Sequence, residues 1–295
     1  MKPASFEYHR VDRTEDALER LAELGEDAKV LAGGQSLVAM MNFRLVRPPA
    51  LVDITRIPDL KYVARDGDAL RIGALTVHRE VELLRDPDVI SGYELLPRAA
   101  RWVGHYPIRT RGTFGGSIAH GDPAAEWCML ALLLDATIVV AGPQGERGIP
   151  AADFFLGFFT TALEPGELVV EVRFPKPRPH AAIQEFARRH GDFAIVAAAV
   201  AVAVDGDRIS DPRVVVGGVD EVPLRVEAAE RALQGAAPGG EAFAEAGRAA
   251  AGAVDPPSDV HGSAEYRKDL TDVLVRRALA EAMHADRRGS DGRGD

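Results

Sequence analysis

The sequence predicts a two-domain α+β protein, and three observations support that fold class. The chain has 295 residues, which is about twice the usual length of a single domain. Its first half alternates short apolar runs of strand type with helical patterns. Beyond a proline-rich segment at Phe174–His180, the pattern changes to strands followed by alanine-rich helices. We therefore expect two domains, over residues 1–177 and 178–286.

The first elements of the front domain are predicted from caps, apolar faces and breakers. Asp12 and Glu15 have the spacing of a capping box before a helix, and Gly25 stands where that helix would end. Residues 29–32 form a short apolar strand that runs into two glycines. Ser36 could cap a brief helix, which Pro48 and its neighbour end. Residues 50–54 then read as a buried strand.

The remaining elements follow the same logic. We expect a strand pair near residues 62–64 and 69–73, helices around 78–84 and 94–103, and a long apolar segment at 127–134. The three alternating prolines after Phe174 predict an extended, stiff connection. Behind it we expect strands at 181–188, 195–204 and 213–217, then helices from Val226. Ser263 is expected to cap the last helix, which runs to His284, and residues 287–295 are predicted to be disordered.

Composition excludes several classes of protein. The chain has 35 Lys+Arg against 45 Asp+Glu, a net charge of −10, which argues against sequence-independent nucleic-acid binding. A single cysteine, Cys128, excludes a disulfide framework, and also an iron–sulfur cluster held by this chain alone. The longest apolar run has 12 residues, whereas a membrane span needs about 20. These observations predict a cytoplasmic protein.

A glycine-rich turn follows the first predicted apolar strand. In Leu31-Ala32-Gly33-Gly34-Gln35-Ser36-Leu37 the adjacent glycines allow positive φ and let successive backbone N–H groups converge on an oxyanion. The Ser36 hydroxyl and the start of a helix add donors that suit a phosphate. A tight turn without a ligand would account for the same residues about equally well.

A second loop of similar composition lies about 80 residues further along the chain. Thr110-Arg111-Gly112-Thr113-Phe114-Gly115-Gly116-Ser117 leads into Asp122, Pro123 and Glu126. Asp122 with Pro123 is typical of a helix start, and Glu126 could either complement the helix dipole or accept a ribose hydroxyl. Two phosphate-type loops together predict an elongated ligand with several anchor points, such as a dinucleotide.

Other catalytic and nucleotide-binding motifs are absent. The sequence has no G-x-G-x-x-G after its first strand and no G-x-x-x-x-G-K-[ST]. It has no G-x-S-x-G elbow and no H-E-x-x-H, and its eight histidines lack close ligand spacing. His120 lies beside the second loop, where a surface or hydrogen-bonding role is the commoner one. We predict no catalytic residue and no metal site, and a cofactor that carries the chemistry.

The two loops resemble the FAD-binding signatures of the flavoprotein subunits of molybdenum hydroxylases. That family includes the medium subunit of carbon monoxide dehydrogenase and the FAD domain of xanthine dehydrogenase. The likeness covers almost the whole chain, including its first eight residues, the segment 163–172 and the segment 265–270.

This resemblance implies the fold in more detail. It implies a vanillyl-alcohol-oxidase (PCMH)-type FAD-binding domain of two α/β subdomains, over about residues 1–58 and 59–177. A small α+β domain with a three-stranded antiparallel sheet would follow. Residues 32–36 would surround the pyrophosphate, residues 113–117 would contact the phosphates and ribityl chain, and Glu126 would lie near the adenosine ribose.

The resemblance also implies contacts outside the two loops. Val103 and Val169 would make apolar contacts to the flavin or adenine. Asp192 and Phe193 would approach the isoalloxazine, although a turn aspartate and a first core residue of a strand are equally good readings of them. The predicted FAD-binding residues are Leu31, Ala32, Gly33, Gly34, Gln35, Ser36, Leu37, Val103, Thr110, Thr113, Phe114, Gly115, Gly116, Ser117, Asp122, Glu126, Val169, Asp192 and Phe193.

Three positions depart from the family pattern. Gln35 stands where many relatives have histidine, and Ser117 stands where asparagine is commoner. Gln184 stands where the xanthine enzymes have a lysine near the flavin, which speaks against an NAD-reducing role.

The resemblance predicts the FAD-carrying electron-transfer subunit of a heterotrimeric molybdenum hydroxylase. A large molybdopterin subunit would oxidise the substrate, and a small subunit with two [2Fe–2S] clusters would pass electrons to FAD. A dimer of such heterotrimers is the expected assembly. A stand-alone FAD-dependent oxidoreductase and a nucleotide-binding assembly factor are the competing interpretations.

Overall fold

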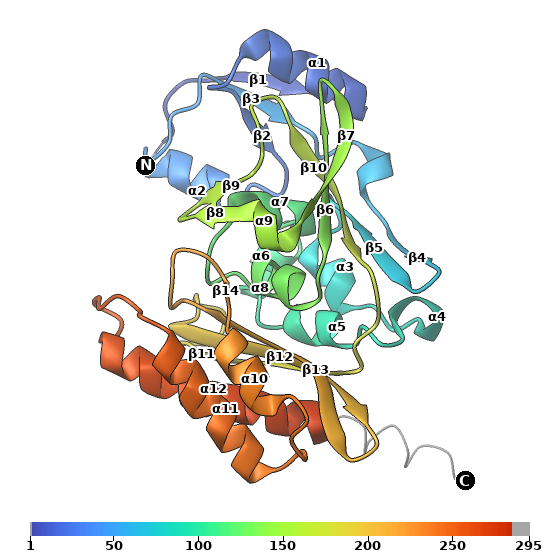
Figure 1. Cartoon of the computed structure of the whole chain (residues 1–295). Coiled ribbons are helices and arrows are strands. Elements are labelled where there is room, and N and C mark those ends of the chain that lie inside the picture. The colour runs from blue at the N-terminus through green and yellow to red at the C-terminus, as the bar shows by residue number, and fades with distance from the viewer. Residues whose placement is uncertain (1, 285–295) are drawn as a thin grey trace.

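The computed structural model describes residues 2–284, so the predicted tail at 287–295 lies outside the described residues. Figure 1 shows three regions one below the other: a small N-terminal region, a middle region and a C-terminal domain. The N-terminal region is a three-stranded parallel sheet, in the order β1-β3-β2, with two helices. Its elements are β1 (Glu7–Arg10), α1 (Thr14–Leu24), β2 (Lys29–Leu31), α2 (Leu37–Asn42) and β3 (Ala50–Asp53).

The middle region contains a five-stranded sheet in the order β4-β5-β10-β6-β7, whose strand pairs are antiparallel. Its strands are β4 (Val63–Asp66), β5 (Ala69–Gly73), β6 (Thr137–Gly142), β7 (Gly145–Pro150) and β10 (Leu168–Phe174), with the hairpin β8 (Phe155–Gly157) and β9 (Thr160–Thr161) beside it. Its helices are η1 (Pro58–Leu60), α3 (His78–Glu82), α4 (Pro87–Ile90), α5 (Leu95–Ala99), α6 (Tyr106–Arg109), α7 (Phe114–His120), α8 (Glu126–Leu133) and α9 (Ala151–Phe154).

The C-terminal domain is an antiparallel sheet covered on one face by three helices (Figure 1). The elements are β11 (His180–Phe186), β12 (Val196–Asp205), β13 (Arg208–Gly217), β14 (Leu224–Arg225), α10 (Glu227–Leu233), α11 (Gly240–Ala253) and α12 (Ala264–His284). The three long strands that the sequence predicts are present, and the two-residue β14 adds a fourth strand to the sheet.

The second face of this sheet packs on the middle region. Along β12, Ala198 and Val200 belong to the apolar core on the helix side, whereas Ala197 and Ala199 belong to the core that also contains α8. Both faces are therefore buried, which explains why β12 is an uninterrupted apolar run. Small alanines on the α8 side let the helix approach the sheet closely.

Helix α8 is the buried centre of the molecule. All its residues from Trp127 to Leu133 are buried, because sheets or helices surround it on every side. The sequence predicts an apolar segment at 127–134, and the structure shows a helix that begins one residue earlier, at Glu126.

Two predicted helix caps are wrong, and a third predicted residue, Ser36, stands at the N-cap of α2 but makes no side-chain hydrogen bond to the helix. Helix α1 begins at Thr14, after Arg13 and without a side-chain cap, so Asp12 and Glu15 form no capping box. Asp122 does not begin α8: its Oδ1 accepts the Ala124 N–H at 2.8 Å, and Ala125 is the N-cap. By contrast, Gly25 ends α1 with a φ of 79°, and the Ser263 hydroxyl accepts the Tyr266 N–H at 3.1 Å at the start of α12.

The proline-rich connection between β10 and β11 is anchored to the middle region. The Arg178 N–H donates to the Gly92 carbonyl at 2.8 Å. The buried Arg178 guanidinium forms ion pairs with Asp135 at 3.2 Å and Asp211 at 3.0 Å. These contacts fix the segment at both domains.

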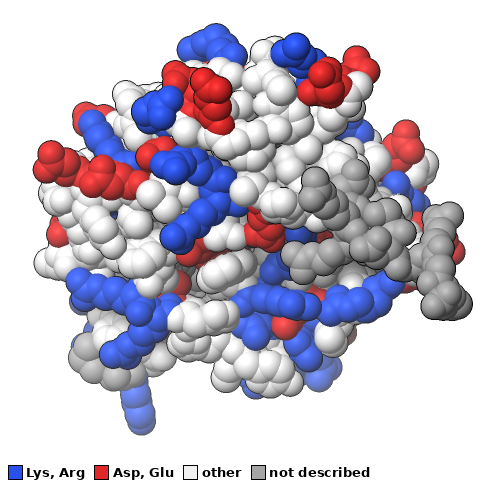
Figure 2. Space-filling view, turned by 90° about the horizontal axis from the view of Figure 1, so that it is seen from below, with Lys and Arg blue, Asp and Glu red and all other residues white. Residues whose placement is uncertain are grey.

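Charges of both signs are dispersed over the C-terminal face. Figure 2 shows Lys and Arg side chains next to Asp and Glu side chains, with uncharged surface between them. Each helix of this domain has an ion pair along its length: Arg231–Glu227 on α10, Arg248–Glu245 on α11 and Arg276–Asp272 on α12. Within residues 2–284, no helix has the length and apolar character needed to cross a membrane.

Candidate functional site

The two glycine-rich loops, about 80 residues apart in sequence, lie against each other. A Cβ placed on Gly33 would overlap the Arg111 carbonyl oxygen, and a Cβ on Gly116 would lie 3.8 Å from the Ala32 side chain. The first loop leaves β2, and the second leads into α7. The structure therefore brings together the two sequence motifs that predicted one elongated ligand.

The first loop presents a row of free backbone donors. Gly34 has a φ of +71°, a left-handed conformation that glycine adopts without strain and that is common in anion-binding turns. Among residues 2–284, the N–H groups of Gly34, Gln35, Ser36 and Leu37 donate to no acceptor. The Gln35 side-chain amide donates to the Gly33 carbonyl at 3.0 Å and so stabilises the turn. Four adjacent donors without partners suit an oxyanion.

We expected the second loop to offer free backbone N–H groups as the first loop does, but the structure shows otherwise. Its N–H groups are used within the chain: Phe114 donates to the Thr76 carbonyl, Gly115 to the Ala74 carbonyl, and Gly116 to the Thr113 hydroxyl at 3.1 Å. Gly115 allows close packing, because a Cβ at this position would lie 2.4 Å from the Ala74 Cβ, which is shorter than a van der Waals contact. We therefore expect a bulky residue at Gly115 to act through packing.

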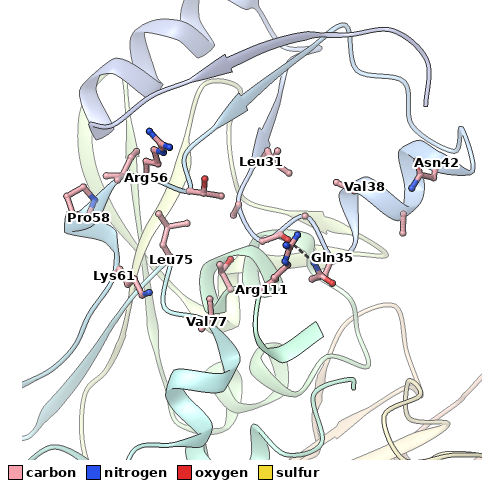
Figure 3. Close-up of a pocket in the computed structure, with 17 residues that line it drawn as sticks. Leu31, Gln35, Val38, Asn42, Arg56, Pro58, Lys61, Leu75, Val77 and Arg111 are labelled. Carbon is pink, nitrogen blue, oxygen red and sulfur yellow. Dashed lines mark hydrogen bonds between the residues drawn. The ribbon is translucent and has the colours of Figure 1, made fainter. Parts of the chain in front are cut away.

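A cavity of about 690 Å³ opens beside the first loop (Figure 3). Such a volume is within the usual range for a small-molecule site. Leu31, Ala32, Gly33, Gly34, Gln35 and Thr113 from the predicted set line it. Its other lining residues are Val38, Ala39, Asn42, Thr55, Arg56, Ile57, Pro58, Lys61, Leu75, Val77 and Arg111.

Three cations of this cavity are residues that the sequence reasoning missed. Arg56, Lys61 and Arg111 all line it, and Figure 3 shows Arg111 beside Gln35, with Arg56 and Lys61 on the opposite side. Lys61 pairs with Glu80 at 2.9 Å, whereas among the described residues neither arginine forms an ion pair. A cavity with two such arginines and four free N–H groups favours a ligand with several negative charges.

Several predicted residues lie in the core rather than at this cavity. Phe114 is fully buried and packs on Trp127 with ring centroids 4.6 Å apart. Val103 and Val169 are also buried in the core around α8. Thr110 is exposed, and its hydroxyl donates to the Pro107 carbonyl at 2.9 Å. Five predicted residues of the two loops do not line the cavity: Ser36, Leu37, Gly115, Gly116 and Ser117.

His78 and Trp127 form a buried pair that packs against the second loop. Trp127 Nε1 donates to His78 Nδ1 at 2.9 Å, and the other edge of the His78 ring faces Gly112. Burial, with a smaller contribution from Arg109, lowers the pKa of His78 to about 3. The ring is therefore neutral at ordinary pH, and its Nδ1 accepts the hydrogen bond from the indole N–H.

Asp122 lies in the turn between α7 and α8, and Glu126 is the first residue of α8. Desolvation by burial raises the pKa of Asp122, and it raises the pKa of Glu126 to about 7, to which the Asp122 charge adds. Burial lowers the pKa of neighbouring His120, whose ring stacks on Phe159 with centroids 4.7 Å apart. Glu126 is thus a partly protonated group near neutral pH.

Asp192 and Phe193 lie in the exposed loop between β11 and β12. The Asp192 N–H donates to the Arg189 carbonyl at 3.2 Å, as in a turn, and the Phe193 side chain is 70% exposed. His190 stacks on Trp102 of the middle region, with centroids 5.7 Å apart and planes 17° apart. This stacking fixes the loop against the segment that contains Val103.

The position of Gln184 differs from the expectation drawn from the family. Its side chain points to the helix layer and donates to Glu281 of α12 at 2.5 Å. Successive residues of a strand face opposite sides, so the next residue, Glu185, faces the middle region. The alternation of Ala181, Ala182 and Ile183 between the two cores supports this assignment.

Two family descriptions match the chain. Residues 4–177 match the FAD binding domain in molybdopterin dehydrogenase, and residues 181–282 match the CO dehydrogenase flavoprotein C-terminal domain. This chain belongs to the FAD-binding subunits of the molybdopterin dehydrogenases. The predicted family and fold are confirmed.

Relatives and solved structures agree along the whole length. The chain is 43% identical to the 6-hydroxypseudooxynicotine dehydrogenase complex subunit alpha of Paenarthrobacter nicotinovorans, over 97% of each chain. It is 38% identical to the carbon monoxide dehydrogenase medium chain of Hydrogenophaga pseudoflava, over 96% of this chain and 98% of that one. A solved carbon monoxide dehydrogenase from Hydrogenophaga pseudoflava has a TM-score of 0.92 at 39% identity, covering 97% of this chain and 99% of that one.

The residues of this chain fit the cofactor of its family. The free N–H groups of Gly34–Leu37 can bind a diphosphate, and the cavity beside them contains cations but no acidic lining residue. The chain is therefore the FAD-binding subunit of an oxidoreductase, and the predicted enzyme class and cofactor are confirmed.

Proposed function

We propose that this chain relays electrons from [2Fe–2S] clusters of a small partner subunit, through FAD held at its two loops, to a terminal acceptor. A large molybdopterin subunit would oxidise the substrate. We also propose a dimer of heterotrimers as the working assembly and the cytoplasm as its location. Bound FAD would supply the redox chemistry, and the residues of this chain would bind, orient and shield it.

The row of free N–H groups at Gly34–Leu37 carries the proposal. These four adjacent donors have no acceptor within the described chain, and they remain available to a ligand at the edge of the cavity. The diphosphate of a dinucleotide would satisfy them, and Arg56 and Arg111 would balance its charge. The single cysteine, Cys128, is buried, so the clusters must lie on a partner.

The test is anaerobic reduction of the complex purified through this chain. We expect a flavin absorption spectrum together with iron and molybdenum, and bleaching of the flavin band when a substrate of the molybdenum subunit is added. A stand-alone oxidoreductase would show flavin without either metal. An assembly factor would show a flavin that partner and substrate leave oxidised, and either result would overturn the proposal.

A further inference from the structure

Glu185 of β11 faces the start of α8. It pairs across the sheet with Ala197 of β12, which pairs with Gly217 of β13, so these three positions form one row on one face. A Cβ on Gly217 would lie 2.9 Å from the Pro123 carbonyl and 2.5 Å from Met129 Sδ. The row therefore lies directly against the segment from Pro123 to Met129, which contains Glu126.

The carboxyl groups of Glu126 and Glu185 have no cationic partner among the described residues. Among residues 2–284, no arginine or lysine pairs with Glu126 or Glu185, and the charge of Glu126 acts on Glu185. The other titratable neighbours are Asp122, His120 and Cys128. Burial raises the pKa of Glu185 well above its ordinary value, and Glu126 raises it further.

One oxygen of Glu185 lacks a hydrogen-bond partner. Its Oε1 exposes less than 1 Å² and accepts no hydrogen bond from the described residues. Leaving a buried acceptor unpaired is unfavourable. Glu185 therefore lacks a hydrogen-bond donor, and two neighbouring carboxyl groups do not suit a phosphate.

We propose that Glu185, next to the predicted FAD-binding residue Glu126, accepts a hydrogen bond from a hydroxyl group of the flavin dinucleotide, so that the C-terminal domain contributes a residue to the cofactor site. Hydroxyl groups are neutral donors, and two carboxyl groups can accept from neighbouring hydroxyls at once. The glycine loop would select the diphosphate, and the carboxyl pair the sugar-type chain. This inference rests on the proposed function.

The test is FAD binding to the full-length apo-chain at pH 6 and pH 8, measured by quenching of flavin fluorescence. Glu185→Ala should weaken FAD binding about 10- to 100-fold at pH 8, as expected for loss of a hydrogen bond to a charged group. Glu185→Gln should weaken it less, because the amide oxygen still accepts. Wild-type binding should be tighter at pH 8 than at pH 6, because Glu126, whose pKa burial raises to about 7, is then more fully ionised and a carboxylate is the better acceptor.

Glu265→Gln is the matched control, since it removes an exposed carboxylate from the same domain. It should leave both the affinity and its pH dependence unchanged. Thermal unfolding without FAD should show that both variants are as stable as the wild type or more so, because Glu185→Ala removes the buried, partnerless oxygen and Glu185→Gln removes the buried ionisable group beside Glu126. A variant that fails to fold would contradict this.

Two further probes locate the hydroxyl groups. If Glu185→Ala weakens binding of FMN but not of ADP, the ribityl chain is the ligand; the reverse result identifies the ribose. Equal affinities of wild type and Glu185→Ala for FAD, FMN and ADP would overturn the inference while leaving the proposed function intact. A wild-type chain that binds no FAD would instead overturn the proposed function.

Discussion

At the scale of single residues, Gly34 has the most specific task in the proposed site. Its φ of +71° lies in the left-handed region, where side chains are strained, and its N–H is the first of the four free donors. Gly67 has a φ of +59° in the turn between β4 and β5, and a Cβ there would meet nothing within 4 Å. The two glycines share a backbone conformation but differ in their surroundings.

We expect Gly34→Val to abolish FAD binding. A side chain there would meet Leu31 and Val38 at 3.1 Å and would force the loop, with its donors, out of the left-handed turn. Gly67→Val is the control, because it imposes a similar backbone strain of about 1–2 kcal/mol away from the site. Flavin content after purification and FAD titration measure the effect. Equal flavin content in both variants would contradict the role of the loop.

At the scale of elements, α8 links the second loop to the C-terminal sheet. Trp127 contacts both Phe114 of α7 and His78 of α3, and the buried hydrogen bond to His78 joins two elements that are far apart in sequence. A buried donor–acceptor pair of this kind is costly to break on one side only.

We expect Trp127→Phe to lower the free energy of unfolding by about 1–3 kcal/mol, because His78 Nδ1 then loses its donor in a dry site. Urea unfolding measures the change. Trp102→Phe is the matched control: Trp102 is only half-buried, and among the described residues its indole N–H makes no hydrogen bond. A larger loss in the control than in Trp127→Phe would refute the assigned hydrogen bond.

Local patterns predicted the glycine loops and the long strands well, because turn chemistry and apolar periodicity are properties of neighbouring residues. Local patterns do not identify Arg56, since its place at the cavity depends on β2 and β3 being parallel neighbours whose carboxyl ends meet at one edge. Asp122 followed by Pro123 is typical of a helix start, but Asp122 accepts the Ala124 N–H in the turn before α8. Which side of the sheet Gln184 and Glu185 face depends on strand register, which a single sequence does not specify.

At the scale of the whole molecule, one apolar core crosses the predicted domain boundary. It includes Leu70 and Trp127 of the front domain together with Ile183, Ala199 and Val215 of the C-terminal sheet. The anchored linker adds the buried Arg178, which pairs with both Asp135 and Asp211. Neither domain can separate without exposing apolar surface.

We therefore expect the chain to unfold in a single cooperative transition. Because the C-terminal domain shields α8, its loss would expose the centre of the front domain. Differential scanning calorimetry should give a calorimetric enthalpy equal to the van't Hoff enthalpy, with a second scan as the check of reversibility. Two resolved transitions would show that the domains unfold independently.

Gly217 lets the C-terminal sheet lie close to the start of α8, because it has no side chain. Position 217 carries only hydrogen, and even an alanine there would press on the sulfur of Met129 and the carbonyl of Pro123. A larger residue at position 217 would push on the start of α8 and, through this helix, on the second glycine-rich loop.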